Sequence, residues 1–135
     1  MQEPPADKTP EPQAVPKQHR FAICYKTQAG EAFEGEFENH ILTIGETQKA
    51  ELGLTRRLEG MPVDQVPNKT FQMAYELAWM EISLSVRPAW ANSLDGLYSE
   101  ELVHVIYAEV VKHERRFHGR KGDAEPSDID GPAQF

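Results

Sequence analysis

The sequence predicts an α+β fold that is mainly helical, with an N-terminal β-hairpin followed by a three-helix core. Between residues 19 and 41 apolar side chains alternate with a period of two, and beyond residue 43 they recur at helical spacing. Both ends of the 135-residue chain are polar and contain several prolines or glycines. We therefore expect one domain at residues 19–118, between a flexible Pro-rich arm at 1–18 and a flexible acidic tail at 119–135.

The hairpin is predicted with a definite register. Placing Tyr25 opposite Phe33 and Phe21 opposite Phe37 brings the aromatic side chains to one face. This register leaves residues 28–30 as a three-residue loop. The loop ends in glycine, which adopts the left-handed conformation of that position without strain.

The residues of the second strand indicate what lies on each face of the hairpin. Gly35 comes to lie opposite Ile23, where the missing side chain leaves room for a neighbouring segment to approach. The side chains of Glu34, Glu36 and Glu38 point to the other face. We expect that face to be solvated or to meet a basic partner.

A capping box marks the start of the first helix. Thr43 and Glu46 have the spacing at which each side chain accepts a hydrogen bond from the other residue's backbone N–H. The helix is expected to stop at Gly60. Pro62 and Pro67 then predict an extended connector.

Two longer helices follow. The earlier one begins at Asn68 or Thr70 and ends at Arg87, and the later one opens at Ser99 and closes before Gly119 on a basic turn. We expect them to form an antiparallel pair. Apolar residues cover two faces of the earlier helix, which predicts contacts on two sides. They are Phe71, Ala74, Tyr75, Ala78, Trp79 and Ile82 on one face and Met73, Leu77, Met80 and Leu84 on the other.

Charge and composition argue against several classes of partner. The net charge is −8 and acidic residues occur along the whole chain, whereas nucleic acid requires clustered Lys and Arg. The basic residues between Lys112 and Lys121 fit the end of a helix instead. The first residues lack the pattern of a signal peptide, and no apolar stretch reaches the length that spans a bilayer. We therefore expect no membrane contact and a cytoplasmic location.

No motif for catalysis or cofactor binding stands out. Cys24 is the only cysteine and lies in an apolar strand, so we expect a small buried hydrophobe and no disulfide. His113 and His118 are five residues apart and lack the spacing of metal ligands, and no glycine-rich loop opens a helix. We expect no metal, no cofactor and no enzymatic activity.

Glutamates and aromatic residues of the helices leave alternatives open. Trp79 and Tyr107, with Trp90 and Tyr98, could line a ligand pocket, although an aromatic stripe at helical spacing is usually core. Four glutamates could face one another for acid–base chemistry, but solvated helix faces account for them more simply. These glutamates are Glu76, Glu81, Glu109 and Glu114.

Trp90 differs from the other aromatic residues because it follows Pro88 in a loop. There a large ring either plugs the end of the helix pair or stands out as a contact anchor. The residues that we expect to contact a protein partner are Trp90, Phe33, Phe37, Tyr98 and the terminal Phe135.

In its pattern the chain resembles the small tail-morphogenesis proteins of tailed bacteriophages, often described as tail assembly chaperones. The resemblance begins with an acidic-aromatic strand at 33–37 and a Leu-Thr-Ile helix start at 42–44. It continues with an apolar helix at 74–84, an Arg-Pro-x-Trp break at 87–90 and a closing helix at 101–117. These features lie within the predicted domain and leave both tails out.

The resemblance implies a non-enzymatic role in the host cytoplasm. The protein would hold the tape-measure protein or tail-tube subunits soluble while the tail polymerises, alone or as an oligomer. A structural subunit of the tail or baseplate, retained in the virion, is the alternative, and its N-terminal arm would lace into neighbouring subunits. A small enzyme or ligand-binding domain is a third hypothesis, which predicts a closed pocket near Trp90 with at least two converging polar groups.

Overall fold

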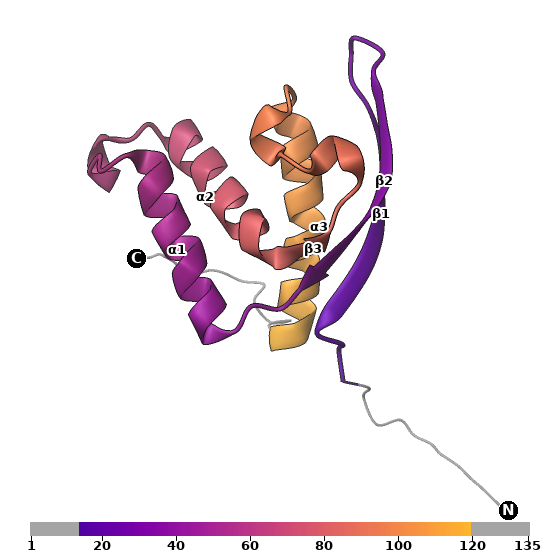
Figure 1. The fold of residues 1–135 in the computed structure, drawn as a ribbon, viewed down its shortest axis with the longest axis horizontal. Helices are drawn as coiled ribbons and strands as arrows, with labels where there is room; N and C mark the ends of the chain where they lie inside the picture. The colour runs from indigo at the N-terminus through magenta and orange to yellow at the C-terminus, as the bar shows by residue number, and fades with distance from the viewer. Residues whose placement is uncertain (1–13, 120–135) are drawn as a thin grey trace, which may run out of the picture.

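The computed structural model describes residues 14–119. It has one three-stranded antiparallel sheet and three α-helices (Figure 1), which confirms the α+β class. Residues 1–13 and 120–135, which make up most of the two predicted tails, lie outside the described residues. The elements are β1 (Gln18–Lys26), β2 (Ala32–His40), α1 (Ile44–Leu58), α2 (Asn68–Ser83), β3 (Leu84–Val86) and α3 (Glu100–His118), with the sheet order β1-β2-β3.

β1 and β2 form the predicted hairpin in the predicted register. Tyr25 lies opposite Phe33, and Phe21 lies opposite Phe37. Gly30 ends the loop with a φ of 94°, and its N–H donates to a backbone carbonyl at the start of the loop at 2.9 Å. The alternation of side chains and the glycine requirement together were sufficient to define this register.

The third strand was not predicted. α2 ends at Ser83, and the next three residues pair antiparallel with β2. Leu84 lies opposite Asn39, so its assignment to the second helix is wrong. A strand of three residues is too short to show a period of two, and its apolar residues extend the helical pattern by coincidence.

α2 and α3 run in the same direction rather than antiparallel. Lys69, at the start of α2, pairs with Glu100 at the start of α3 at 3.2 Å. Trp79 of α2 donates to Glu114, near the end of α3, at 2.6 Å. The connection through β3 therefore returns the chain to the end of the molecule where α2 began (Figure 1).

All three predicted helix starts are confirmed, with α2 beginning at Asn68, one of its two expected positions. Thr43 and Glu46 form both hydrogen bonds of the capping box before α1. α1 ends at Leu58, and Glu59 follows in the left-handed conformation. The hydroxyl of Ser99 caps α3.

The segment between α1 and α2 differs from its prediction. It contains a 3-10 turn at Val63–Gln65, so the connector is not extended throughout. α2 follows Pro67 without a side-chain cap, and neither Asn68 nor Thr70 acts as one. Pro67 is itself the N-cap residue, and its carbonyl accepts the first hydrogen bond of the helix, from the N–H of Phe71 at 2.9 Å.

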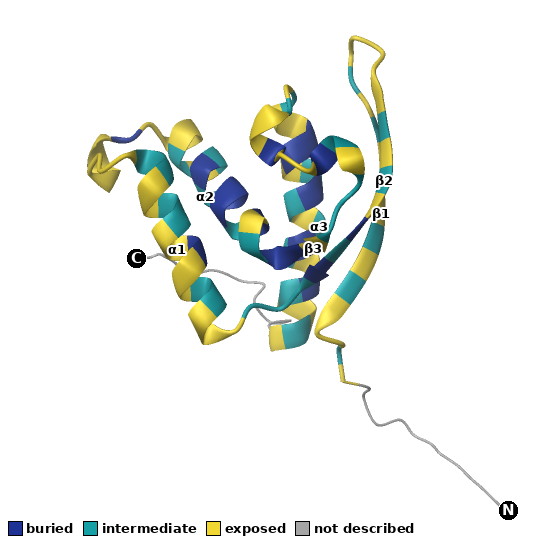
Figure 2. Ribbon diagram, viewed as in Figure 1, coloured by how far each residue is buried: buried dark blue, intermediate teal, exposed yellow. Residues whose placement is uncertain are grey.

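The core lies where the sheet meets α2 and α3 (Figure 2). α1 packs against α2 and buries only Ala50. α2 thus contacts α1 as well as α3 and β3, which confirms the prediction of contacts on two sides. None of the described helices is long and apolar enough to cross a bilayer. The largest fully buried side chains are Phe37, Met80, Leu102, Ile106, His113, Val110, Asn39 and Ser83.

Candidate partner-binding groove

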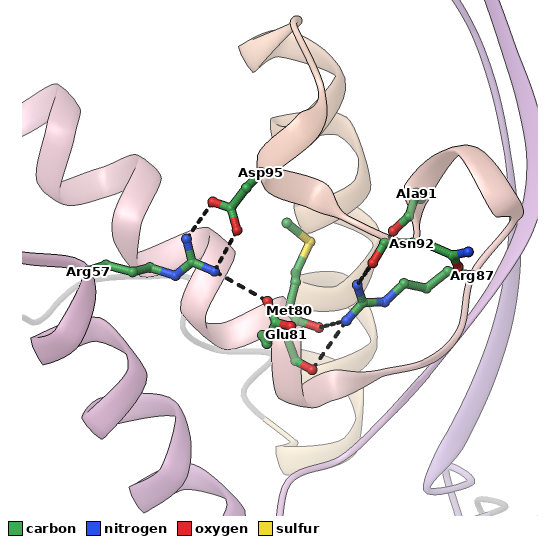
Figure 3. A network of polar contacts seen from close by, with 7 residues as sticks. All are labelled: Arg57, Met80, Glu81, Arg87, Ala91, Asn92 and Asp95. Atoms are coloured by element: carbon green, nitrogen blue, oxygen red, sulfur yellow. Dashed lines mark hydrogen bonds and ion pairs between the residues drawn. The ribbon is translucent and has the colours of Figure 1, made fainter.

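The segment between α2 and α3 is fastened by Arg87. Its guanidinium donates to the carbonyls of Met80 at 3.5 Å and Glu81 at 3.2 Å, near the end of α2 (Figure 3). It also donates to the carbonyls of Ala91 at 3.5 Å and Asn92 at 3.2 Å. The last carbonyls of a helix lack some of their partners within the helix, and Arg87 supplies further donors there, including one to the Met80 carbonyl, which also accepts from the N–H of Leu84. The arginine of the Arg-Pro-x-Trp break is therefore structural.

A second arginine fastens α1 to the same region. The guanidinium of Arg57 pairs with Asp95 at 2.6 Å and with Glu81 of α2 at 3.2 Å (Figure 3). Both acidic side chains are more than half exposed, so each pair adds little stability in water. The geometry nevertheless fixes where α1 lies against α2.

Trp90 is turned inward. Its ring centroid lies 5.0 Å from that of Phe33 and 5.6 Å from that of Phe37. Its Nε1–H donates to the carbonyl of Glu34 at 2.9 Å. Phe37 is fully buried. Three of the five residues predicted to contact a partner thus form one aromatic cluster that joins the hairpin to the loop.

The space beside this cluster is closed by Pro88. A Cβ atom added to Gly35 would lie 2.6 Å from the Cβ of Pro88, which confirms the close approach predicted at Gly35. Pro88 and Trp90 therefore pack directly against β2 at Gly35, so side chains cover this part of the surface near Trp90. Of the two remaining predicted contacts, Tyr98 is fully exposed, and Phe135 lies outside the described residues.

An open groove of about 460 Å³ lies elsewhere, between the β2–α1 junction, α2 and α3. Most of its wall is apolar. Trp79 and Tyr107, for which the sequence left core and pocket open, are partly buried against the core and also line this groove. Apolar lining residues are Ile41, Leu42, Ile44, Trp79, Tyr107 and Val111.

Glu114 is the acidic group of the groove. Its carboxylate accepts a hydrogen bond from Trp79 Nε1 at 2.6 Å. Burial raises the pKa of Glu114 above its ordinary value, and the bond from Trp79 and the nearby His118 and His113 oppose that rise. Burial also raises the pKa of the neighbouring Tyr107 phenol. The groove therefore offers an apolar wall with one poorly solvated carboxyl.

The mouth of the groove exposes an aliphatic side chain. Ile44, the first residue of α1, is 83% exposed. Its position is fixed by the capping box and by His40, whose ring contacts Ser85 Oγ at 2.7 Å and Glu46 Oε2 at 3.0 Å. The backbone N–H of Thr43 and then the contact with His40 lower the pKa of Glu46. A large aliphatic residue is thus held in water at a rigid site.

The prediction that Glu76 lies on a solvated helix face is wrong. Its side chain is 5% exposed and contacts His104 Nδ1 at 2.6 Å and Gln72 Nε2 at 2.8 Å. The parallel packing of α2 and α3 brings His104 over this position. Glu81 is exposed as expected, so the two glutamates of α2 have different environments.

Cys24 is exposed on the outer face of the hairpin, so its assignment to the core is wrong. The alternation that buries Ile23 necessarily places its neighbour on the other side. His113 is buried, and its ring contacts Asn39 Nδ2 at 2.8 Å and the carbonyl of Pro16 at 2.7 Å. Within residues 14–119, no three His, Cys, Asp or Glu side chains group as metal ligands do.

The groove gave no signal in the sequence because its walls come from distant segments. The nearest indication was the pair Trp79 and Tyr107 on two helices. No protein-family model, no curated protein and no solved structure matches the chain.

Proposed function

We propose that this chain is a non-enzymatic protein-binding domain that acts in phage tail morphogenesis, where it holds the tape-measure or tail-tube protein as an assembly chaperone. The observation that carries the proposal is the exposed Ile44 at the mouth of an apolar groove. A single exposed aliphatic residue is common on protein surfaces, but together with the apolar wall of the groove Ile44 forms contiguous apolar surface, which is typical of a binding site for another protein. The pattern resemblance supplies the class of client.

The size and chemistry of the groove suit part of a protein chain. Its volume of about 460 Å³ lies in the range of sites that hold a few large side chains. An amphipathic helix presents such side chains as a row at three- and four-residue spacing. A tape-measure protein is long and helical, so it offers many such rows.

The polar groups support binding rather than turnover. A carboxyl that acts as a general acid or base must be able to exchange a proton with a substrate group within hydrogen-bond reach. Among the described residues, the hydrogen bond to Glu114 comes from the indole of Trp79, which neither gains nor loses a proton near neutral pH. Arg115 and His118 also line the groove, and neither donates a hydrogen bond to Glu114.

A structural subunit of the tail or baseplate is the second candidate, and one observation favours it. The chain before β1 is fastened to the domain at two points. The carbonyl of Pro16 contacts His113 at 2.7 Å, and the carbonyl of Lys17 accepts from the N–H of Ile41 at 2.9 Å. An N-terminal segment anchored in this way would leave the domain at a fixed place, as a lacing arm requires.

Co-expression with the tape-measure protein of the same genome tests the chaperone proposal. We expect the chain to raise the soluble fraction of that protein and the variant Ile44→Asp to abolish the effect. Leu52→Asp is the matched control, because Leu52 is also exposed on α1, at 60%, but does not line the groove. Equal behaviour of the two variants, or a genome without tail genes, would contradict the proposal. Abundant peptides from the chain in purified virions would favour the structural subunit.

A further inference from the structure

The two edges of the sheet differ in how well they are protected. β3 has three residues, and the β2–β3 ladder has an irregularity between Glu38 and Asn39. β1 has nine residues, its pairing with β2 is continuous, and the sheet order gives it no second neighbour within residues 14–119. Proteins usually blunt a long edge strand with proline, a bulge or a covering segment. β1 contains neither proline nor bulge, and its Arg and Lys residues, Arg20 and Lys26, leave Ala22 and Cys24 between them, so the middle of its edge is suited to pairing.

The hairpin loop determines which backbone groups face this edge. The N–H of Thr27 donates to the carbonyl of Glu31, and at the other end the carbonyl of Lys17 accepts from Ile41. Hydrogen-bonded positions alternate along an antiparallel pair, so the odd-numbered residues of β1 bond to β2. The residues whose N–H and C=O groups face outward are Gln18, Arg20, Ala22, Cys24 and Lys26.

We propose that the open edge of β1 pairs antiparallel with β1 of a second copy of this chain, about a two-fold axis at Ala22, and so joins two sheets into one. In this register Arg20 lies opposite the partner's Cys24, and Gln18 lies opposite the partner's Lys26. All five outward positions then find a partner, and each pair exchanges two backbone hydrogen bonds. The proposal does not depend on the proposed function.

Neighbouring registers are less favourable. An axis at Ile23 places Arg20 opposite the partner's Lys26, and like charges at opposed positions repel. An axis at Phe21 places Lys26 opposite the partner's Pro16, which has no N–H to donate. The axis at Ala22 avoids both faults.

Side chains on both faces support a second copy as the occupant. On the inner face Phe21 and Tyr25 are only partly buried, and the register places Phe21 opposite the partner's Ile23. On the outer face Cys24 lies next to Glu34, with 3.6 Å between Sγ and Oε2. Within the described residues Glu34 forms no ion pair, whereas Arg20 pairs with Glu36 at 3.3 Å and with Glu38 at 3.2 Å in its own chain. The register places Arg20 of the other copy on the same face as Glu34, with Cys24 between them, so these acidic side chains and Glu34 would share the Arg20 charge. An interface confined mainly to one strand is small, so the dimer should be concentration-dependent.

Molar mass in solution tests the proposal on the full chain. Sedimentation velocity or light scattering should give about twice 15.3 kDa at high concentration. Ala22→Pro should return the mass to that of the monomer, because proline is tolerated on an edge strand where its missing N–H faces outward. Ala22→Thr keeps the N–H and should leave the dimer intact. A monomeric wild-type chain at every concentration, or a dimeric and folded Ala22→Pro variant, would overturn the proposal.

Disulfide cross-linking tests the register and does not require the proline variant to fold. In the double variant Ala22→Cys, Cys24→Ser, the two cysteines would meet at about 5.5 Å between Cα atoms, within reach of a disulfide. In the wild type the two copies of Cys24 would lie about 14 Å apart along the strands. We expect the double variant to form a covalent dimer with diamide much faster than the wild type. Equal rates, or no cross-linked dimer from the double variant, would reject this pairing.

Discussion

Replacing Gly35 by Ala should destabilise the domain, although Ala is normally the better residue in a strand. A Cβ at this position would lie 2.6 Å from Pro88 Cβ, 2.7 Å from Pro88 Cγ and 3.3 Å from Trp90 Nε1. Overpacking of this kind costs about 1–3 kcal/mol, whereas removing a strand glycine recovers only about 0.5–1 kcal/mol. The free energy of unfolding should therefore fall by a net amount on the order of 1–2 kcal/mol. For a domain of this size, each kcal/mol lowers Tm by roughly 4–8 °C.

Urea unfolding followed by circular dichroism measures this loss. Gly53→Ala is the matched control, because Gly53 lies inside α1 and a Cβ there would meet Ala78 Cβ at 3.8 Å, an ordinary contact. It should stabilise the domain by up to about 1 kcal/mol. Pro88→Gly removes the ring that opposes the new Cβ. The double variant Gly35→Ala, Pro88→Gly should therefore lose less stability than the sum of the losses in the two single variants. If Gly35→Ala unfolds at the same or a higher urea concentration than the wild type, the close packing of Pro88 against Gly35 is refuted.

Three further predictions concern single side chains, each measured by urea unfolding. Glu114→Gln should be more stable than the wild type at neutral pH, because burial raises the pKa of Glu114 and its ionised form disfavours the fold. Because its pKa is raised, Glu114 binds a proton more readily in the folded than in the unfolded chain. The difference in stability between Glu114→Gln and the wild type should therefore narrow as the pH falls toward 4.5, the ordinary pKa of Glu. A difference that stays constant with pH would contradict a raised pKa for Glu114. Glu76→Ala should cost about 1–3 kcal/mol, because it removes the acceptor for His104 and Gln72, and Glu76→Gln should cost less. Tyr98→Ser should change stability by less than about 0.5 kcal/mol, since Tyr98 is fully exposed.

The parts of the fold that sequence reasoning predicted are those decided by local rules. The hairpin register followed from the side-chain alternation and from Gly30, whose φ is 94°. The capping box followed from the spacing of Thr43 and Glu46. Each feature depends on residues that lie close together in the chain or on directly opposed strands, so the sequence contains all the information that they need.

The parts that were wrong depend on contacts between distant segments. The direction of α3 relative to α2 depends on β3, a strand of three residues that exists because it pairs with β2. Two antiparallel helices can be joined by a short turn. Here β3 instead runs along the edge of the sheet, antiparallel to β2, and returns the chain to the end where α2 began, so α3 starts there and runs parallel to α2. The solvated position predicted for Glu76 is wrong for the same reason, because the parallel arrangement brings His104 to it.

The candidate site could not be read from the sequence, because no local pattern contains it. Trp90 was singled out as a contact since it follows a proline in a loop, but its ring and its N–H are both used against the hairpin. With the loop fixed to β2 by Trp90 and to α2 by Arg87, the surfaces left open in the described chain include the α1 end of the groove and the outer edge of β1.

α1 and β1 lie on opposite sides of the molecule, with α2 and α3 between them (Figure 1). Pairing through β1 would therefore leave Ile44 of each copy accessible, and one dimer would present two grooves. A long helical client that reaches both grooves would bind more tightly than to either alone, because the second contact is intramolecular. In that case Ala22→Pro should weaken client binding without altering the groove. Ile44→Asp should abolish binding and leave the dimer intact, so the two variants separate assembly from recognition.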